Sequence, residues 1–142
     1  MGWSNYHLHQ FIDGNTYYGE PDPDYDDDVM ENENGVAISQ LVSREGARFH
    51  YEYDFGDSWV HEILVEKILP MEKGTQYPVC IKGKRACPPE DVGGVWGYSE
   101  FLETIMNPKD PEYDDMVEWA GGDFNPEIFD MDEVNERLND RG

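Results

Sequence analysis

Aromatic and polar residues alternate over residues 49–55, and this pattern constrains the fold more than any other feature of the chain. The apolar members are Phe49, Tyr51, Tyr53 and Phe55. A repeat of two residues is typical of a strand with one buried face. Residues 56–58, Gly-Asp-Ser, interrupt the repeat, and residues 59–69 are predicted to form a second strand. The two strands together predict a β-hairpin.

The length of the connecting loop decides which residues of this hairpin face each other. A two-residue loop would mix apolar and polar side chains on each face. A three-residue loop over 56–58 places Phe55 opposite Trp59 and leaves one continuous apolar face, so we expect this register. It also sets Glu52 opposite Glu62, a pair of like charges that needs solvent or a cation between them.

Further strands and turns are expected before this hairpin. Asp13-Gly14 separates residues 7–12 from residues 16–18, and this dipeptide predicts a hairpin with a type I′ turn. Ser39 is predicted to cap a short helix that Gly46 ends. Residues 70–97 are rich in Pro and Gly, so they are expected to form a long structured loop.

The C-terminal part of the chain shows helical patterns. Apolar residues recur at helical spacing over 98–106, and Asn107-Pro108 ends that run. Asp110 is the expected cap of a second helix that Gly121-Gly122 stops. Asp130 and Glu133 form the capping box of a third. Strands first and helices last predict one α+β domain over 1–142, a mostly antiparallel sheet with helices packed on one face.

The chain is strongly acidic, with 32 acidic and 10 basic residues among 142 and a net charge of −22. The negative electrostatic field of such a chain repels phosphate backbones and anionic membranes, so direct binding to nucleic acids is disfavoured. Basic proteins, metal cations and cationic ligands fit the field, and solubility alone also explains it. Mimicry of a nucleic acid would require regularly spaced acids, which the crowded stretch over 20–33 does not supply.

No stretch is apolar and long enough for a membrane span, and residues 1–4 lack a signal pattern. A cytoplasmic location is expected. Its reducing conditions would keep Cys80 and Cys87 as thiols, and their separation does not match the Cys-x-x-Cys pairs of zinc ribbons. Buried thiols are the favoured interpretation, with metal ligation or redox chemistry as alternatives.

Several strings identify a family resemblance. They are Tyr-Asp-Phe-Gly-Asp-Ser-Trp at 53–59 with His61, His-Leu-His-Gln-Phe at 7–11, Ala-Cys-Pro-Pro-Glu-Asp at 86–91 with Gly93, Gly94, Gly97 and Tyr98, and Trp-Ala-Gly-Gly-Asp-Phe at 119–124. Over nearly its whole length the chain resembles the plasmid pRiA4b ORF-3-like family. The resemblance implies bacterial or archaeal relatives, some on plasmids or insertion elements, and no established activity or catalytic residues.

The chain departs from this family at its beginning. Relatives usually carry a further strand and a helix ahead of the position of Gly2-Trp3-Ser4. If this form is shortened, we expect exposed apolar surface where that helix would pack, and hence self-association.

Three histidines and two aspartates form the candidate metal site. His7 and His9 lie on the same face of a strand, roughly 7 Å apart by the strand rise, and could share an ion. With His61, Asp54 and Asp57 they would suit Zn²⁺ or another divalent transition metal. The register above instead directs His61 into the aromatic face, where a hydrogen bond to Tyr53 or to a backbone carbonyl is the commoner outcome.

Two other catalytic or metal-binding patterns are weaker. Ser58, His61 and Asp54 have the residue types of a hydrolase triad, but no nucleophile-elbow pattern surrounds the serine. The acidic stretch partly matches an EF-hand loop through Asp22, Asp24, Asp26 and Glu33. Position six of that loop is Asp27 rather than Gly, which favours a solvated acidic loop.

Half of the ten basic residues cluster on or beside the long loop. These five residues, here called the basic island, are Lys67, Lys73, Lys82, Lys84 and Arg85. Balance of the excess acids within the chain is the favoured interpretation. Docking of an anionic ligand or of an acidic region of a second copy is the alternative.

Two hypotheses for function follow. The first is a non-catalytic binding domain with an unknown protein partner, accessory to a mobile element or its host. It would use loops that carry Asp57, Trp59, Cys87, Glu90, Asp91, Trp96 and Asp123. The second is a metal-dependent hydrolase built on the histidine and aspartate site. Buried, unligated histidines would favour the first hypothesis, and convergent histidines in an open cleft the second.

Overall fold

The computed structural model describes residues 1–22, 24 and 30–140. The chain forms two compact units. Residues Asn5–Pro70 make up one, here called the sheet unit. Residues Met1–Ser4 and Met71–Gly142 make up the other, here called the helical unit.

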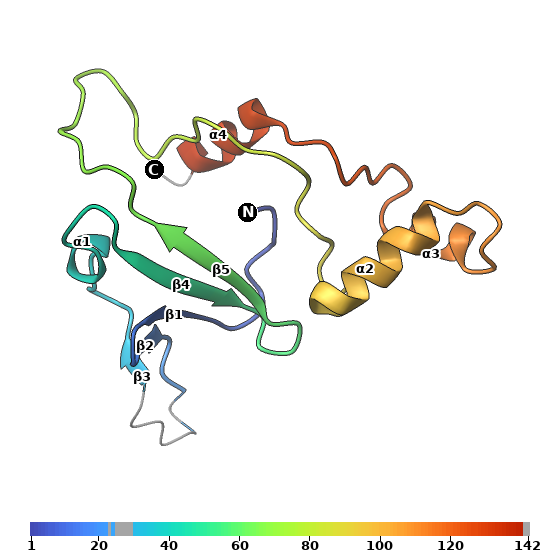
Figure 1. The fold of residues 1–142 in the computed structure, drawn as a ribbon, viewed down its shortest axis with the longest axis horizontal. Helices are drawn as coiled ribbons and strands as arrows, with labels where there is room; N and C mark the ends of the chain where they lie inside the picture. The colour runs from blue at the N-terminus through green and yellow to red at the C-terminus, as the bar shows by residue number, and fades with distance from the viewer. Residues whose placement is uncertain (23, 25–29, 141–142) are drawn as a thin grey trace. The chain divides into compact units, whose positions relative to one another are not determined.

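The sheet unit contains five strands and one short helix (Figure 1). The strands are β1 (His9–Asp13), β2 (Thr16–Gly19), β3 (Met30–Asn32), β4 (Arg48–Tyr53) and β5 (Trp59–Leu64), and the helix is α1 (Ile38–Leu41). Their order in the sheet is β3-β2-β1-β4-β5. Only the pairing of β2 with β3 is parallel among the described strand pairs.

The first hairpin is confirmed, but its turn is not type I′. Strand β1 pairs with β2 so that Asp13 faces Thr16, which leaves Gly14 and Asn15 as the loop. Gly14 has φ +58, while Asn15 is not among the residues with positive φ. Glycine at the first of two central positions is the pattern of a type II′ turn, which also matches the twist of paired strands.

The central hairpin is confirmed with a different register. Tyr53, rather than Phe55, lies opposite Trp59, and Phe49 lies opposite Ile63. The connection therefore spans five residues, 54–58, instead of three. Asp54 and Ser58 at its two ends both have positive φ, +61 and +56. The shift relative to the expected register is two residues, so Phe49, Tyr51 and Tyr53 still share the aromatic face. The prediction that Phe55 belongs to it is wrong, because Phe55 lies in the loop and is 43% exposed.

The new register removes the predicted clash between Glu52 and Glu62. Glu62 lies opposite His50, and its carboxylate accepts a hydrogen bond of 2.7 Å from Arg48. Glu52 lies opposite Val60 and accepts hydrogen bonds from other side chains of its own face. Each acid thus has its own partner without a bridging cation.

The short helix α1 is not capped by Ser39, which lies inside it. Its N-cap is Ala37, and the Gln40 side chain accepts the Ala37 N–H at 2.7 Å. The helix ends at Val42, before Gly46. Gly46 has φ +83 and its N–H donates to the Val65 carbonyl at 2.7 Å, so it belongs to the turn that leads into β4.

The core of the sheet unit is the aromatic face of β1 and β4. Phe49 and Tyr53 are 5% and 2% exposed. The Phe11 ring lies 4.9 Å from that of Tyr51 and 6.4 Å from that of Phe49, centroid to centroid. The alternation seen in the sequence is therefore the core of this unit.

The helical unit contains α2 (Gly94–Ile105), α3 (Tyr113–Trp119) and α4 (Met131–Asp140) (Figure 1). Helix α2 begins four residues before the predicted Tyr98, because Gly93 takes φ +102 as its N-cap. Between β5 and α2, residues 65–93 form no helix or strand, which confirms most of the predicted long loop.

Both predicted carboxylate caps accept backbone N–H groups. Asp110 accepts the N–H of Glu112 at 2.8 Å, but the N-cap of α3 is Glu112, so the prediction of Asp110 as its cap is wrong by two residues. Asp130 accepts the N–H of Glu133 at 3.1 Å at the start of α4. These bonds satisfy donors that the first helical turn leaves open.

The four N-terminal residues contact the loop ahead of α2 within the helical unit. The Trp3 indole donates to the Pro88 carbonyl at 2.9 Å. The Ser4 N–H donates to the Glu90 carboxylate, also at 2.9 Å. Residues 86–91, one of the strings behind the family resemblance, are thus held by the start of the chain.

The chain is an α+β protein, with a mostly antiparallel sheet in its N-terminal part and helices mainly in its C-terminal part, as predicted. Across the residues that the structure describes, no helix combines the length and apolarity that crossing a membrane requires.

Candidate functional site

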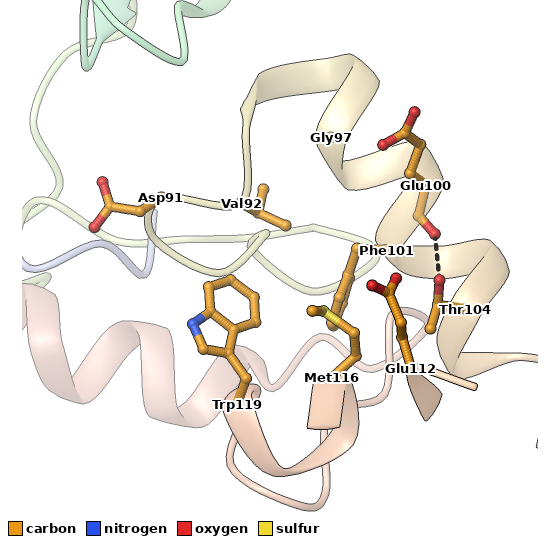
Figure 2. A pocket seen from close by; sticks show the side chains of 9 residues that line it. All are labelled: Asp91, Val92, Gly97, Glu100, Phe101, Thr104, Glu112, Met116 and Trp119. Carbon is orange, nitrogen blue, oxygen red and sulfur yellow. Dashed lines mark hydrogen bonds between the residues drawn. The ribbon is translucent and has the colours of Figure 1, made fainter. Parts of the chain in front are cut away.

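A pocket of about 360 Å³ opens beside α2 and α3 in the helical unit (Figure 2). Its lining residues are Asp91, Val92, Gly97, Glu100, Phe101, Thr104, Glu112, Met116 and Trp119. A pocket of this size falls within the range of sites that hold small ligands or single side chains.

The apolar side of the pocket follows from how α2 packs on α3. Phe101 is 4% exposed and its ring meets Trp119 edge to face, with centroids 5.8 Å apart. Phe124 contacts Phe101 from another side at 5.5 Å. Trp119 remains 49% exposed, so one part of its ring supports Phe101 while another borders the pocket. Met116 of α3 also lines this side of the pocket (Figure 2).

Close backbone approach shapes the entry of the chain into α2. A Cβ at Gly97 would lie 2.2 Å from the Val92 carbonyl oxygen, so a side chain cannot fit there without movement. The Gly97 N–H bonds to the Gly93 carbonyl at 3.1 Å. Asp91, just ahead, has φ +59. These constraints bring Asp91 and Val92 to the pocket beside the first turns of α2.

The polar lining of the pocket is acidic. Asp91, Glu100 and Glu112 are its acidic residues, and none of the described residues that line the pocket is basic. In the described part of the chain, no basic side chain forms an ion pair with Glu100 or Glu112. In Figure 2 the Glu112 carboxylate lies beside Thr104 and Phe101, and the Thr104 hydroxyl donates to the Glu100 carbonyl.

The predicted metal ligands lie in the sheet unit, where His7 pairs with Asp54. The His7 Nε2 is 3.5 Å from Oδ2 of Asp54, longer than a good hydrogen bond. Asp54 is 7% exposed, and its Oδ1 accepts the N–H groups of Gly56 at 3.0 Å and Asp57 at 3.4 Å. Asp54 therefore fixes the β4–β5 loop, and Asp57 belongs to that same loop through its backbone.

His9 has a different carboxylate partner. Its Nε2 lies 2.8 and 2.9 Å from the two carboxylate oxygens of Glu33. Because an ionised carboxylate only accepts, this nitrogen carries a hydrogen. The His9 ring also lies 5.9 Å from that of Tyr51. Burial, and next the negative charge of Glu33, raise the pKa of the Tyr51 phenol above its usual value.

His61 donates from Nδ1 to the backbone carbonyl of Tyr51 at 2.9 Å, as expected for a histidine on the aromatic face. Its ring lies 5.6 Å from the Tyr51 ring. The Ser58 hydroxyl, in turn, donates to Glu52 at 2.9 Å, so it is oriented by a carboxylate. The three histidines thus lie beside three different groups, Asp54, Glu33 and the Tyr51 carbonyl. A metal shared among them stays a prediction.

The two cysteines are both free thiols in the helical unit. The Cys80 N–H donates to the Asn135 side chain of α4 at 2.7 Å, which ties the long loop to that helix. Cys87 packs beside Gly2, where an added Cβ would lie 3.2 Å from the cysteine Cβ. Burial raises the pKa of the Cys87 thiol, which favours its neutral form.

The acidic stretch and the basic island have partners inside the chain. Pro23, Asp26 and Asp27 lie outside the described residues, whereas the Asp22 carboxylate accepts the Asp24 N–H at 2.9 Å. Two members of the basic island, Lys67 and Arg85, pair with acids at 3.8 and 3.7 Å. This agrees with balance of charge within the chain.

The residues predicted for interaction loops fall into both units. Asp57 and Trp59 belong to the sheet unit, while the remaining five belong to the helical unit: Cys87, Glu90, Asp91, Trp96 and Asp123. Trp96 lies not in a loop but in the first turn of α2, where it is 85% exposed. Asp91 alone of the seven lines the pocket.

Most pocket residues were absent from the sequence-based candidates. In the sequence, Phe101 and Met116 are apolar residues of two predicted helices, and the acids Glu100 and Glu112 have no distinguishing pattern. One signal was available: Trp119 and Asp91 lie within strings that carry the family resemblance. Glu33, the partner of His9, was noticed only as part of an EF-hand pattern.

Comparison with known proteins identifies the family. Residues 1–133 match the family described as plasmid pRiA4b ORF-3-like protein. The chain belongs to this family. The match includes the β4–β5 loop, the loop ahead of α2 and the whole pocket.

Two relatives illustrate the family. An uncharacterized protein, y4hQ of Sinorhizobium fredii (strain NBRC 101917 / NGR234), is 36% identical over 142 residues, which cover 99% of this chain and 72% of that protein. The crystal structure of a protein of unknown function, MM3350 from Methanosarcina mazei Go1, shares 40% identity with a TM-score of 0.82. That similarity covers 94% of this chain and 75% of the other. Neither name states an activity.

Proposed function

We propose that this protein is a non-catalytic binding domain that holds a partner protein at the α2–α3 pocket. The observation that carries the proposal is the pocket itself. It combines an apolar side at Phe101, Met116 and Trp119 with Glu100 and Glu112, which have no basic partner among the described residues. Concave sites with an apolar lining and a few convergent polar groups are the usual form of binding sites.

The exposure of Trp119 supports a role in recognition. Tryptophan is enriched among residues that dominate binding energy, and a half-exposed indole against a rigid aromatic neighbour loses little conformational freedom on binding. Phe101 and Phe124 already fix the position of this ring.

Site-specific photo-crosslinking in the source cells tests the proposal. A photoreactive phenylalanine at position 119 should crosslink one protein reproducibly, and the same group at the exposed Ile128 of the helical unit should not. The captured protein is then identified, purified and titrated against wild type and Trp119→Ala. We expect the substitution to weaken binding at least about tenfold. Equal crosslinking at both positions, or equal affinity, would reject the proposal.

The family description supports a search for the partner among plasmid-encoded proteins and those of other mobile elements. The two free thiols fit the reducing conditions of a cytoplasmic location. Both points extend the same proposal and are tested by the identity of the crosslinked protein.

The metal-dependent hydrolase is the second candidate, favoured by the pair of His7 with the buried Asp54. Plasma mass spectrometry of untagged protein purified without chelators tests it, with His7→Ala and His9→Ala as separate variants because their partners differ. The binding proposal expects substoichiometric metal in all three proteins. Stoichiometric zinc that only His7→Ala loses would instead make the hydrolase the leading candidate.

A further inference from the structure

We infer that the α2–α3 pocket recognises an arginine side chain of the partner protein. The inference rests on the proposed function and adds the chemistry of the group that is bound. It combines three properties of the pocket: its volume, its aromatic side and the sign of its charges.

The volume and the apolar side fit one long side chain. The pocket measures about 360 Å³, at the lower end of the range for ligand sites. Phe101, Met116 and Trp119 offer a surface on which the methylene stem of an arginine can pack. Their aromatic and thioether groups are also polarizable, which favours a nearby cation.

The charges select a cation. Glu112 and Glu100 have no basic partner among the described residues, and Asp91 is a third acidic residue of the lining. An anionic group would meet repulsion here and within the field of a chain with net charge −22. A neutral group would leave Glu100 and Glu112 without a basic partner among the described residues.

Arginine fits the pocket better than lysine because of its shape. A planar guanidinium stacks on an indole face and binds a carboxylate through two parallel N–H groups. Glu112 is the N-cap of α3 and Trp119 is its last residue, seven positions later, so both lie along one face of the helix and an arginine side chain in the pocket borders both. A lysine ammonium offers a point charge without the stacking surface.

Three short capped peptides test the inference on the full chain. Each is Gly-X-Gly, with arginine, lysine or citrulline as X, and citrulline copies the arginine shape without its charge. Binding is followed by nuclear magnetic resonance of the Trp119 indole N–H, assigned with Trp119→Phe. We expect saturable shifts with the arginine peptide, weaker ones with lysine and none with citrulline.

A matched pair of charge variants locates the binding. Glu112→Gln should raise the Kd of the arginine peptide by about two- to fivefold, as expected for a solvent-accessible ion pair. Glu118→Gln makes the same change on α3 outside the pocket and should leave the Kd unchanged. Backbone amide spectra of both variants establish that each is folded.

Other outcomes would overturn the inference. Equal shifts with citrulline and arginine would show that the pocket does not select for a charged side chain. An equal loss of affinity in both glutamine variants would assign the effect to the net charge of the protein alone. Absence of shifts with every peptide would also reject it. In each case, crosslinking at position 119 still decides the proposed function independently.

Discussion

At the residue scale, Asp54 shows how one side chain can serve a loop and resemble a metal ligand at the same time. It is buried, adopts φ +61 and accepts two N–H groups of the β4–β5 loop. Aspartate and asparagine tolerate this backbone region better than most residues, and their side chains suit such local bonds. Asp54 therefore has a structural role in the β4–β5 loop that does not depend on a metal ion.

Substitution of Asp54 separates these roles. We expect Asp54→Ala to lower the free energy of unfolding by about 1–3 kcal/mol, since it removes the acceptor of the Gly56 and Asp57 N–H groups and places alanine at positive φ. Asp54→Asn should cost less, because an amide oxygen can accept the same bonds. Urea denaturation monitored by circular dichroism measures both. Equal losses would contradict the assignment of the loop bonds to Oδ1.

Cys87 provides a second test at this scale. Because burial raises the pKa of its thiol, little thiolate is present near neutral pH and alkylation should be slow. In Cys80→Ser, where Cys87 is the remaining cysteine, we expect iodoacetamide at pH 8 to react severalfold more slowly with native protein than with protein unfolded in urea. Mass spectrometry follows the reaction. Similar rates would mean that Gly2 does not cover the thiol.

At the scale of elements, the period-two repeat correctly predicted two strands and their aromatic face, but not their register. A shift of two residues preserves the face, so the hydrophobic pattern cannot distinguish the predicted pairing of Phe55 with Trp59 from the observed pairing of Tyr53. The observed register instead goes with the positive φ angles of Asp54 and Ser58, which the hydrophobic pattern does not encode. The pocket was not predictable for a similar reason, because Phe101 and Trp119 meet only through the packing of α2 on α3.

Helix α2 gives the prediction at this scale. Alanine is a better helix former than glycine by about 1 kcal/mol. Gly97→Ala should nevertheless lower the stability by about 1–3 kcal/mol, because the new Cβ would meet the Val92 carbonyl. Ser99→Ala, on an exposed position of the same helix, should change it by less than about 0.5 kcal/mol. Thermal denaturation compares the two variants. A more stable Gly97→Ala would mean that the loop ahead of α2 moves to accommodate the new Cβ.

At the scale of the whole molecule, the excess of acids opposes folding. A net charge of −22 on 142 residues gives like-charge repulsion that the described ion pairs offset only locally. The repulsion is largest in the compact state, where the charges are closest, and it is screened by salt.

Stability should therefore rise with ionic strength. Between 20 and 500 mM NaCl, concentrations at which the screening length shortens severalfold, we expect Tm to increase by about 4 °C, the effect of about 1 kcal/mol in a domain of this size. Differential scanning calorimetry in NaCl and in KCl measures it. A rise in only one salt would indicate binding of a specific ion instead of screening.

The bonds of Trp3 and Ser4 to residues 88 and 90 make the helical unit discontinuous along the chain, with Asn5–Pro70 inserted between its two parts. A single cut between Pro70 and Met71 therefore cannot yield two self-sufficient pieces, because the first four residues of the helical unit would leave with the sheet unit. Two cuts, after Ser4 and after Pro70, would be required to release the sheet unit, and a direct junction of Ser4 to Met71 would be required to keep the helical unit in one piece.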